Sequence, residues 1–268
     1  HKDQSYQQDY SIKYATADSS TSVYQVASDR NGVVQILSSK GLLHPFAGEM
    51  LYPGSLVADD SYRPMKDKRI SAIAVYRNQL VYLDDKAVLS NAWAGALYTK
   101  HNLPGAKVFA GGSDFDFLIS DGQSFQYVKK EDVLWENKSN EQVLNMLYDS
   151  IGKRFLVLTP AQIFSFATAE KKYSSFFTSD SLTCFTLAND GRDLVVGTTN
   201  GYIVVDAATG KAKSEINRKL PWNALTAVAE IDGKLWFGSA KGAFMLTDEG
   251  KFNYYASKRW LPSDDVKY

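Results

Sequence analysis

The 268-residue sequence has a single cysteine, Cys184, so no internal disulfide framework can hold its fold together. Cys184 lies among apolar neighbours in residues 182–187, a setting typical of a buried structural thiol rather than a reactive one. Long hydrophobic runs are missing as well, since no stretch approaches the roughly 20 apolar residues of a membrane helix. No signal peptide opens the sequence. We therefore expect no membrane insertion by this segment.

An excess of charge of one sign is also absent, because 30 Lys and Arg residues balance 30 Asp and Glu residues. No basic stripe indicates a nucleic-acid partner. The three histidines, His1, His44 and His101, have no second His or Cys at metal-ligand spacing. Nucleophile elbows, zinc-protease motifs and phosphate-binding loops are missing too. The sequence therefore predicts no metal site, no cofactor and no recognisable catalytic motif.

Aromatic residues are plentiful, at 13% of the chain, and they favour strands. Residues 220–248 contain three short apolar runs separated by two turn dipeptides, Asp232-Gly233 and Lys241-Gly242. Glycine tolerates the positive φ that tight hairpins require, and aspartate bonds its own backbone there. This stretch therefore predicts a three-stranded antiparallel meander.

The meander recurs along the chain with a period of about 40 residues. A four-stranded unit of that length is typical of a propeller blade, and no window shows the i, i+3, i+4, i+7 apolar spacing of a helical repeat. The first strands of successive units are anchored at Val23, Ile70, Lys107, Val143, Leu182, Leu225 and Val266.

We therefore predict an all-β fold, a β-propeller of four-stranded antiparallel blades that fills residues 1–268 as one domain. Six blades are complete in the sequence, and a seventh begins at Val266. The segment from Tyr10 to Thr16 resembles an outer strand, and we expect it to close the seventh blade, because propellers commonly pair strands from opposite chain ends. We also expect the natural polypeptide to continue after Tyr268, or a separate piece to complete that blade. An open or six-bladed ring is the alternative if the chain stops there.

Residues 231–243 read Ile-Asp-Gly-Lys-Leu-Trp-Phe-Gly-Ser-Ala-Lys-Gly-Ala, and residues 189–201 repeat the pattern with Asn-Asp-Gly and Gly-Thr-Thr-Asn-Gly. These units resemble the two-component regulator propeller repeat. Blades two, three and four depart from it, lacking the Trp and the Gly-Thr. The family builds periplasmic sensing domains of bacterial hybrid histidine kinases, so the resemblance implies an extracytoplasmic location, periplasmic or secreted. No kinase, receiver or DNA-binding segment is present.

The function expected from this architecture is a ligand-binding, sensing or interaction module, with a glycan-related role among the expectations. The expected partners are a small molecule or glycan and the remaining part of the same polypeptide. The alternative is the propeller part of a secreted carbohydrate-active enzyme, a glycosidase or lyase, acting either as the catalytic unit or as an accessory to a following domain. The repeat residues are structural and do not decide between these functions.

Candidate binding residues come from two chemistries. Trp93, Trp135 and Trp222 lie in or near expected outer strands and blade junctions, where an exposed ring could stack on a sugar, although covering blade ends is the simpler role. Asp114 and Asp116 flank Phe115 next to an expected inner strand and could point to one face.

The sequence also contains one glycosylation sequon, which starts at Asn137 in a polar segment expected between blades, residues 129–141. It would matter only in a eukaryotic secretory route.

Overall fold

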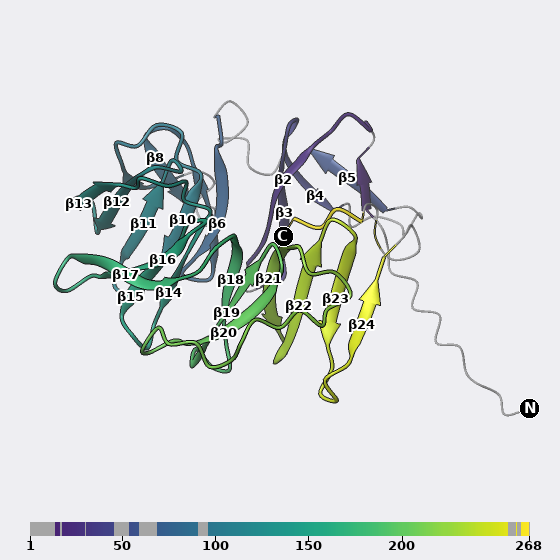
Figure 1. Cartoon of the computed structure of the whole chain (residues 1–268). Coiled ribbons are helices and arrows are strands. Elements are labelled where there is room, and N and C mark those ends of the chain that lie inside the picture. The colour runs from purple at the N-terminus through teal and green to yellow at the C-terminus, as the bar shows by residue number, and fades with distance from the viewer. Residues whose placement is uncertain are drawn as a thin grey trace, which may run out of the picture.

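The computed structural model describes residues 14–16, 18–29, 31–45, 54–58, 69–90, 96–256, 261 and 264–267. All regular elements in that part of the chain are β-strands, grouped into six sheets (Figure 1). The innermost strands of successive sheets contact one another in chain order, which arranges the sheets as blades around an axis. The prediction of an all-β propeller with six blades in this chain is confirmed.

Each blade begins with an inner strand and proceeds outward through antiparallel hairpins. The inner strands are β2 (Val23–Ser28), β6 (Ala72–Tyr76), β10 (Val108–Gly111), β14 (Asn145–Asp149), β18 (Leu182–Ala188) and β21 (Leu225–Ile231). The second strands are β3 (Val34–Ser38), β7 (Gln79–Leu83), β11 (Asp116–Ser120), β15 (Arg154–Leu158), β19 (Asp193–Thr198) and β22 (Lys234–Ser239).

The third strands are β4 (Gly41–Pro45), β8 (Ala87–Ser90), β12 (Ser124–Lys129), β16 (Gln162–Ala167), β20 (Gly201–Asp206) and β23 (Gly242–Leu246). The outer strands are β5 (Gly54–Ala58), β9 (Ala96–Lys100), β13 (Asp132–Lys138), β17 (Lys172–Thr178) and β24 (Phe252–Tyr255). Blades 1 to 6 therefore start at β2, β6, β10, β14, β18 and β21. Blade 5 has three strands, and two isolated bridges, Tyr202 with Asn217 and Val205 with Ala212, continue its outer edge.

The N-terminal strand does not lie where the sequence placed it. β1 (Tyr14–Thr16) pairs in parallel with β5, with Tyr14 opposite Gly54, and so becomes a fifth strand of blade 1. The segment was expected to close a seventh blade with Val266, and that expectation is wrong for these three residues; residues 10–13 lie outside the described part of the chain. The physical reason is that any exposed outer strand can accept an added strand along its edge. The outer strand β5 of blade 1 offers such an edge, just as a seventh blade would.

The predicted turns form as their residues require. Arg77 and Asn78 both have positive φ, at 52° and 62°, between β6 and β7. Asp232 and Gly233 do the same between β21 and β22, at 51° and 71°. Two successive positive φ values define the tight hairpin turn whose twist matches that of the strands.

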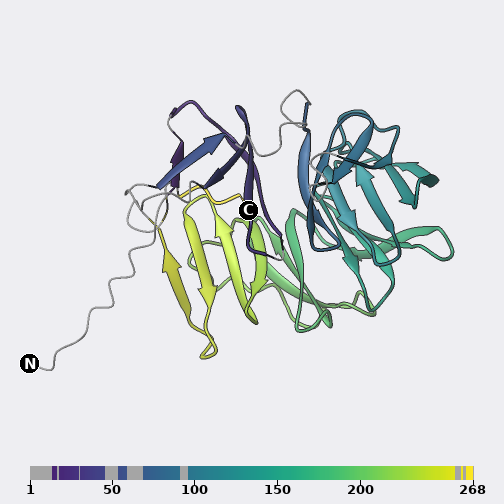
Figure 2. The same cartoon turned by 180° about the vertical axis from the view of Figure 1, so that it is seen from behind.

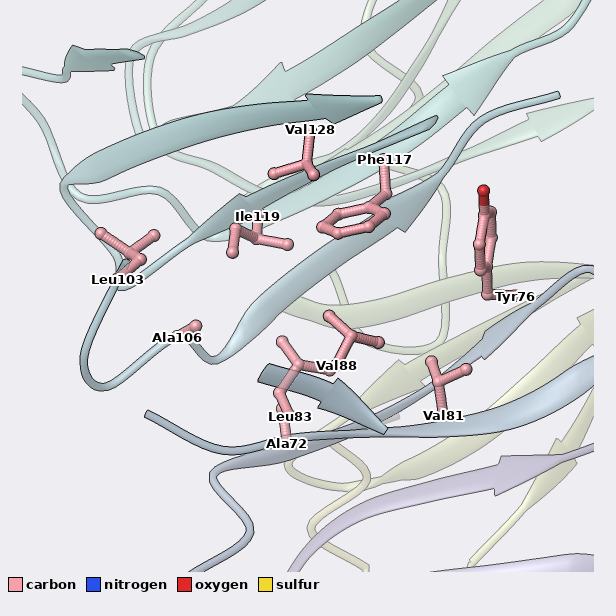
Figure 3. Close-up of a cluster of buried hydrophobic side chains, with 10 residues drawn as sticks. All are labelled: Ala72, Tyr76, Val81, Leu83, Val88, Leu103, Ala106, Phe117, Ile119 and Val128. Carbon is pink, nitrogen blue, oxygen red and sulfur yellow. The ribbon is translucent and has the colours of Figure 1, made fainter. Parts of the chain in front are cut away.

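The core lies between the flat sides of neighbouring blades. Figure 3 shows one such layer, in which Leu83 and Val88 of blade 2 face Phe117 and Ile119 of blade 3. Tyr76 contacts Phe117 edge-on, with ring centroids 6.1 Å apart. Since a single four-stranded sheet is too thin to enclose apolar side chains, each blade depends on its neighbours for burial.

Candidate functional site

A cavity of ≈ 370 Å³ lies where the inner strands begin. All six blades line it, through Gln25, Ile73, Val108, Asn145, Thr183 and Thr226. Each of these residues is at or near the start of its inner strand, so the cavity lies on the axis, at one end of the propeller. Its volume is within the range of small-molecule sites.

Local irregularities direct two of the lining side chains. Pairing of β18 with β19 shifts register between Leu182 and Cys184, and pairing of β21 with β22 shifts between Leu225 and Ala227. The extra residues in these bulges are Thr183 and Thr226. A bulge leaves its extra residue outside the ladder and re-aims the side chain, which explains how two threonines reach the cavity at equivalent positions.

Backbone groups fix the orientation of both amide side chains in the cavity. Ile73 donates its N–H to Gln25 Oε1 at 2.8 Å, and Met146 donates its N–H to Asn145 Oδ1 at 2.8 Å. A backbone N–H can donate only to the oxygen end of a side-chain amide. The NH₂ groups of Gln25 and Asn145 therefore remain to donate to a ligand.

The charged groups lining the cavity are both cationic, Lys107 and Lys267. Among the described residues no carboxylate lines it. Lys267 Nζ lies 3.4 Å from Asp265, whereas Lys107 makes no ion pair with a described carboxylate. The cavity is therefore rich in hydrogen-bond donors and poor in acids.

Cys184 also touches the cavity but is buried, as the sequence predicted. Burial is the main cause that raises the pKa of its thiol to about 11. A thiol with so high a pKa is a poor nucleophile at neutral pH, so Cys184 acts as a packing residue.

The two predicted aspartates lie away from this cavity, Asp114 in the turn between β10 and β11 and Asp116 at the start of β11. Asp116 is buried and accepts hydrogen bonds from the Tyr127 hydroxyl and the Asp114 amide, both at 2.9 Å. Asp114 is exposed and pairs with Lys129 at 2.6 Å, and the hydrogen bond from Lys129 lowers the pKa of its carboxyl. Phe115 between them has a φ of 51°, which breaks the simple alternation that the sequence argument assumed.

The predicted tryptophans differ in environment. Trp135 of β13 stacks on Phe166 of blade 4, with ring centroids 4.3 Å apart, and so packs between blades. Trp222 is 44% exposed, and its Nε1 donates to the Tyr254 hydroxyl at 2.9 Å. That hydroxyl in turn donates to the carbonyl of Lys241. Trp93 lies outside the described residues.

Asn137 is exposed, but its segment is not an insertion between blades. It lies in the outer strand β13 and pairs with Phe125 of β12. The polar character of residues 129–141 comes from their position at a solvent-facing edge.

Sequence reasoning missed the residues that line the axial cavity. A usable signal existed, because each of them lies within four positions of a repeat anchor: Gln25 follows Val23, Asn145 follows Val143, and Thr226 follows Leu225. Aligning the anchors and comparing the residues beside them would have identified the ring.

A metal-binding group of side chains and a membrane-spanning helix are both absent from the described residues. In the described ranges no group of three or more His, Cys, Asp or Glu side chains comes together in a way that could hold a metal ion. The same ranges contain no helix with the length and apolar character needed to traverse a membrane.

The chain is similar in fold to several solved propellers. The extracellular domain of a putative hybrid two-component system from B. thetaiotaomicron superposes with a TM-score of 0.69 at 14% identity, covering 95% of this chain but 36% of that one. Streptogramin B lyase gives a TM-score of 0.66 at 15% identity, covering 88% of this chain and 83% of that one. The WD40 domain of Neurospora crassa Pan2 gives 0.60 at 10% identity, covering 88% and 79%.

No protein-family model and no curated protein sequence matches the chain. Identities this low establish the architecture and leave the function open. The β-propeller fold implied by the resemblance to two-component regulator repeats is confirmed, and the extracellular domain of that two-component system is one of the proteins that share it.

Proposed function

We propose that this chain is a ligand-binding or sensing module whose site is the axial cavity. The observation that carries the proposal is that all six blades contribute residues to one concave, partly polar space at the end of the propeller. A concave site with a few converging polar groups is the usual form of a small-molecule site. An extracytoplasmic location belongs to the proposal and is supported by the likeness to an extracellular domain.

We further propose that the complete ring has seven blades. Gly197 of β19 lies against Leu225, the first residue of the next inner strand, at 3.3 Å from where a Cβ would stand. Gly238 of β22, at the equivalent position one blade later, lies against Val266 in the same manner, at 2.7 Å. This likeness supports Val266 as the first residue of a further inner strand.

Backbone hydrogen bonds support the same equivalence. Leu182 donates its N–H to Pro160 in the preceding blade, at 2.9 Å, as blade 5 begins. Val266 donates its N–H to Ser239 of blade 6 at 2.9 Å, and the Thr226 hydroxyl donates to the carbonyl of Val266. Figures 1 and 2 both place the C-terminal end between blade 1 and blade 6.

The flat sides that face this position carry apolar groups. On β2, Tyr24 and Val26 are 49% and 51% exposed, on the side opposite to the one that packs on blade 2. On blade 6, Trp236 alternates with Leu235 and Phe237, which pack toward blade 5, so it points the other way. We propose that polypeptide following Tyr268 fills this position, in keeping with a chain that spans 36% of the length of the two-component structure.

A glycan is a second candidate ligand, and the observation that favours it is Trp222. Its exposed ring is held in place by the hydrogen bond to Tyr254, and a fixed aromatic face can stack on a sugar ring. Glycosidase chemistry in the cavity is not supported, because it requires two facing carboxylates and the described lining residues include none.

The test is calorimetric titration of the chain with a panel of small anions, neutral metabolites and oligosaccharides. We expect saturable binding without turnover, weakened by Asn145→Ala and left intact by Asn137→Ala. Binding that Asn145→Ala leaves unchanged and Trp222→Ala removes would relocate the site to the Trp222 surface. Chemical conversion of a bound compound would overturn the assignment as a binding module.

A further inference from the structure

We infer that the axial cavity selects a small oxyanion, such as a carboxylate or phosphate. The inference rests on the proposal that this cavity is the binding site, and it specifies the ligand chemistry. It depends on the direction of the hydrogen-bonding groups as well as on charge.

The amide groups provide the first line of evidence. The oxygens of Gln25 and Asn145 are both occupied by backbone N–H groups at 2.8 Å. The NH₂ group is therefore the end of each amide that remains to donate to a ligand, whereas an unconstrained amide could rotate to present either end. Two donors with fixed polarity favour an acceptor-only group, which is what an ionised oxyanion offers.

The charges of the lining residues provide the second line of evidence. Lys107 and Lys267 line the cavity, and no described carboxylate does. Lys267 is partly neutralised by Asp265 at 3.4 Å, so Lys107 carries the larger share of the unpaired positive charge. A cleft lined by charge of one sign concentrates ions of the opposite sign.

Close packing restricts the position of the Lys107 side chain. It directly precedes β10, and its Cε and Nζ lie over Gly122, 2.8 and 3.1 Å from where a Cβ would stand. Any side chain at Gly122 would displace the lysine, and the φ of 107° there already favours glycine. Lys107 and Gly122 also line a neighbouring pocket together with Asp121, so Lys107 lies between that pocket and the axial cavity.

Size limits the ligand. A cavity of ≈ 370 Å³ accommodates a metabolite-sized ion and is too small for a folded partner. The hydroxyl of Thr226 donates to the carbonyl of Val266, so this threonine offers a ligand lone pairs only. The side chains lining the cavity that can donate to an anion therefore include Gln25, Asn145, Lys107 and Lys267.

The experiment is calorimetric titration with citrate and with inorganic phosphate, using glucose as a neutral probe, at low ionic strength. The decisive variant is Asn145→Asp, which keeps an oxygen for the Met146 N–H but replaces the NH₂ donor with a negative oxygen. Asn137→Asp is the matched control, since Asn137 Oδ1 accepts the N–H of Lys138 at the same 2.8 Å on the outer strand β13. Lys107→Gln tests the charge, with Lys172→Gln on the outer strand β17 as its control.

We expect citrate or phosphate to bind, with the tighter of the two identifying the source of the oxyanion. Asn145→Asp should abolish that binding and Lys107→Gln should weaken it about tenfold. Both controls should bind as the parent chain does, and added NaCl should weaken binding through screening. Anion binding that survives Asn145→Asp and Lys107→Gln would overturn the inference. Binding of glucose in preference to both anions would also overturn the inference, although the cavity would remain the binding site. Absence of binding by all three probes would count against the cavity itself.

Discussion

At the scale of single residues, close packing of neighbouring side chains explains why glycine occurs at one position of the second strands. Gly197 lies opposite Cys184 in the ladder, and Gly238 lies opposite Ala227. A Cβ on Gly197 would stand 2.4 Å from Cys184 Sγ. The glycine of each Gly-Thr or Gly-Ser pair therefore makes room for the bulged inner strand that carries a cavity threonine.

Gly197→Ala should destabilise the chain by about 1–3 kcal/mol through overpacking. Chemical denaturation monitored by tryptophan fluorescence measures the change. The double variant Gly197→Ala/Cys184→Ala should recover part of the loss, because the sulfur that the new methyl group meets is gone. If Gly197→Ala lowers the stability by the same amount in the Cys184→Ala background as in the parent chain, the clash is not with the sulfur.

The raised pKa of Cys184 predicts a dependence of stability on pH. Because the folded state holds the thiol proton more tightly than the unfolded chain, the contribution is complete below about pH 9 and declines as pH rises towards 11. The loss should approach about 2 kcal/mol and should be missing in Cys184→Ala. Stability is measured by denaturation across that pH range for the parent chain and for Cys184→Ala. The difference between the two isolates the contribution of the Cys184 thiol from the titration of tyrosines and lysines.

The same burial should protect the thiol from reagents. In the folded chain Cys184 should react with a thiol-specific disulfide at pH 8 far more slowly than in denaturant. Fast labelling of the native protein would contradict its burial.

At the scale of elements, the hairpins were predictable and the place of the N-terminal strand β1 was not. Asp232-Gly233 and Arg77-Asn78 fix their turns by local backbone chemistry, which one sequence is enough to reveal. β1 depends on which exposed edge accepts it, and that choice is made by tertiary packing. The same limit applies to Trp135, whose partner Phe166 belongs to another blade.

Trp135→Ala should cost about 2–3 kcal/mol of stability, because it removes a half-buried ring stacked between blades 3 and 4. Trp222→Ala should cost less than about 1 kcal/mol, since that ring is 44% exposed. Denaturation midpoints of the two variants provide the comparison. Ligand binding at the axial cavity should be unaffected by either change, and a selective loss of binding in Trp135→Ala would return that residue to the list of ligand contacts.

At the scale of the whole molecule, the repeat period was enough to predict blades around an axis, but not the axial site. The cavity is assembled from residues as distant in sequence as Gln25 and Lys267, each unremarkable in its own repeat. Its donor character depends on backbone hydrogen bonds to Gln25 and Asn145 that only the folded ring provides. The anchors beside those residues were visible in the sequence; the direction of their side chains was not.

The spacing of the blades around the axis can be measured between equivalent, exposed turns that join second and third strands. Three such turns contain Lys40 in blade 1, Asn200 in blade 5 and Lys241 in blade 6. Spin labels on cysteines at these sites, in a Cys184→Ala background, report distances by pulsed electron paramagnetic resonance. Seven equal positions around an axis, with one between blades 6 and 1, predict a Lys40–Lys241 distance roughly 1.8 times the Asn200–Lys241 distance. Two equal distances would mean that blades 6 and 1 are direct neighbours, and would contradict the seventh position and the place assigned to Val266.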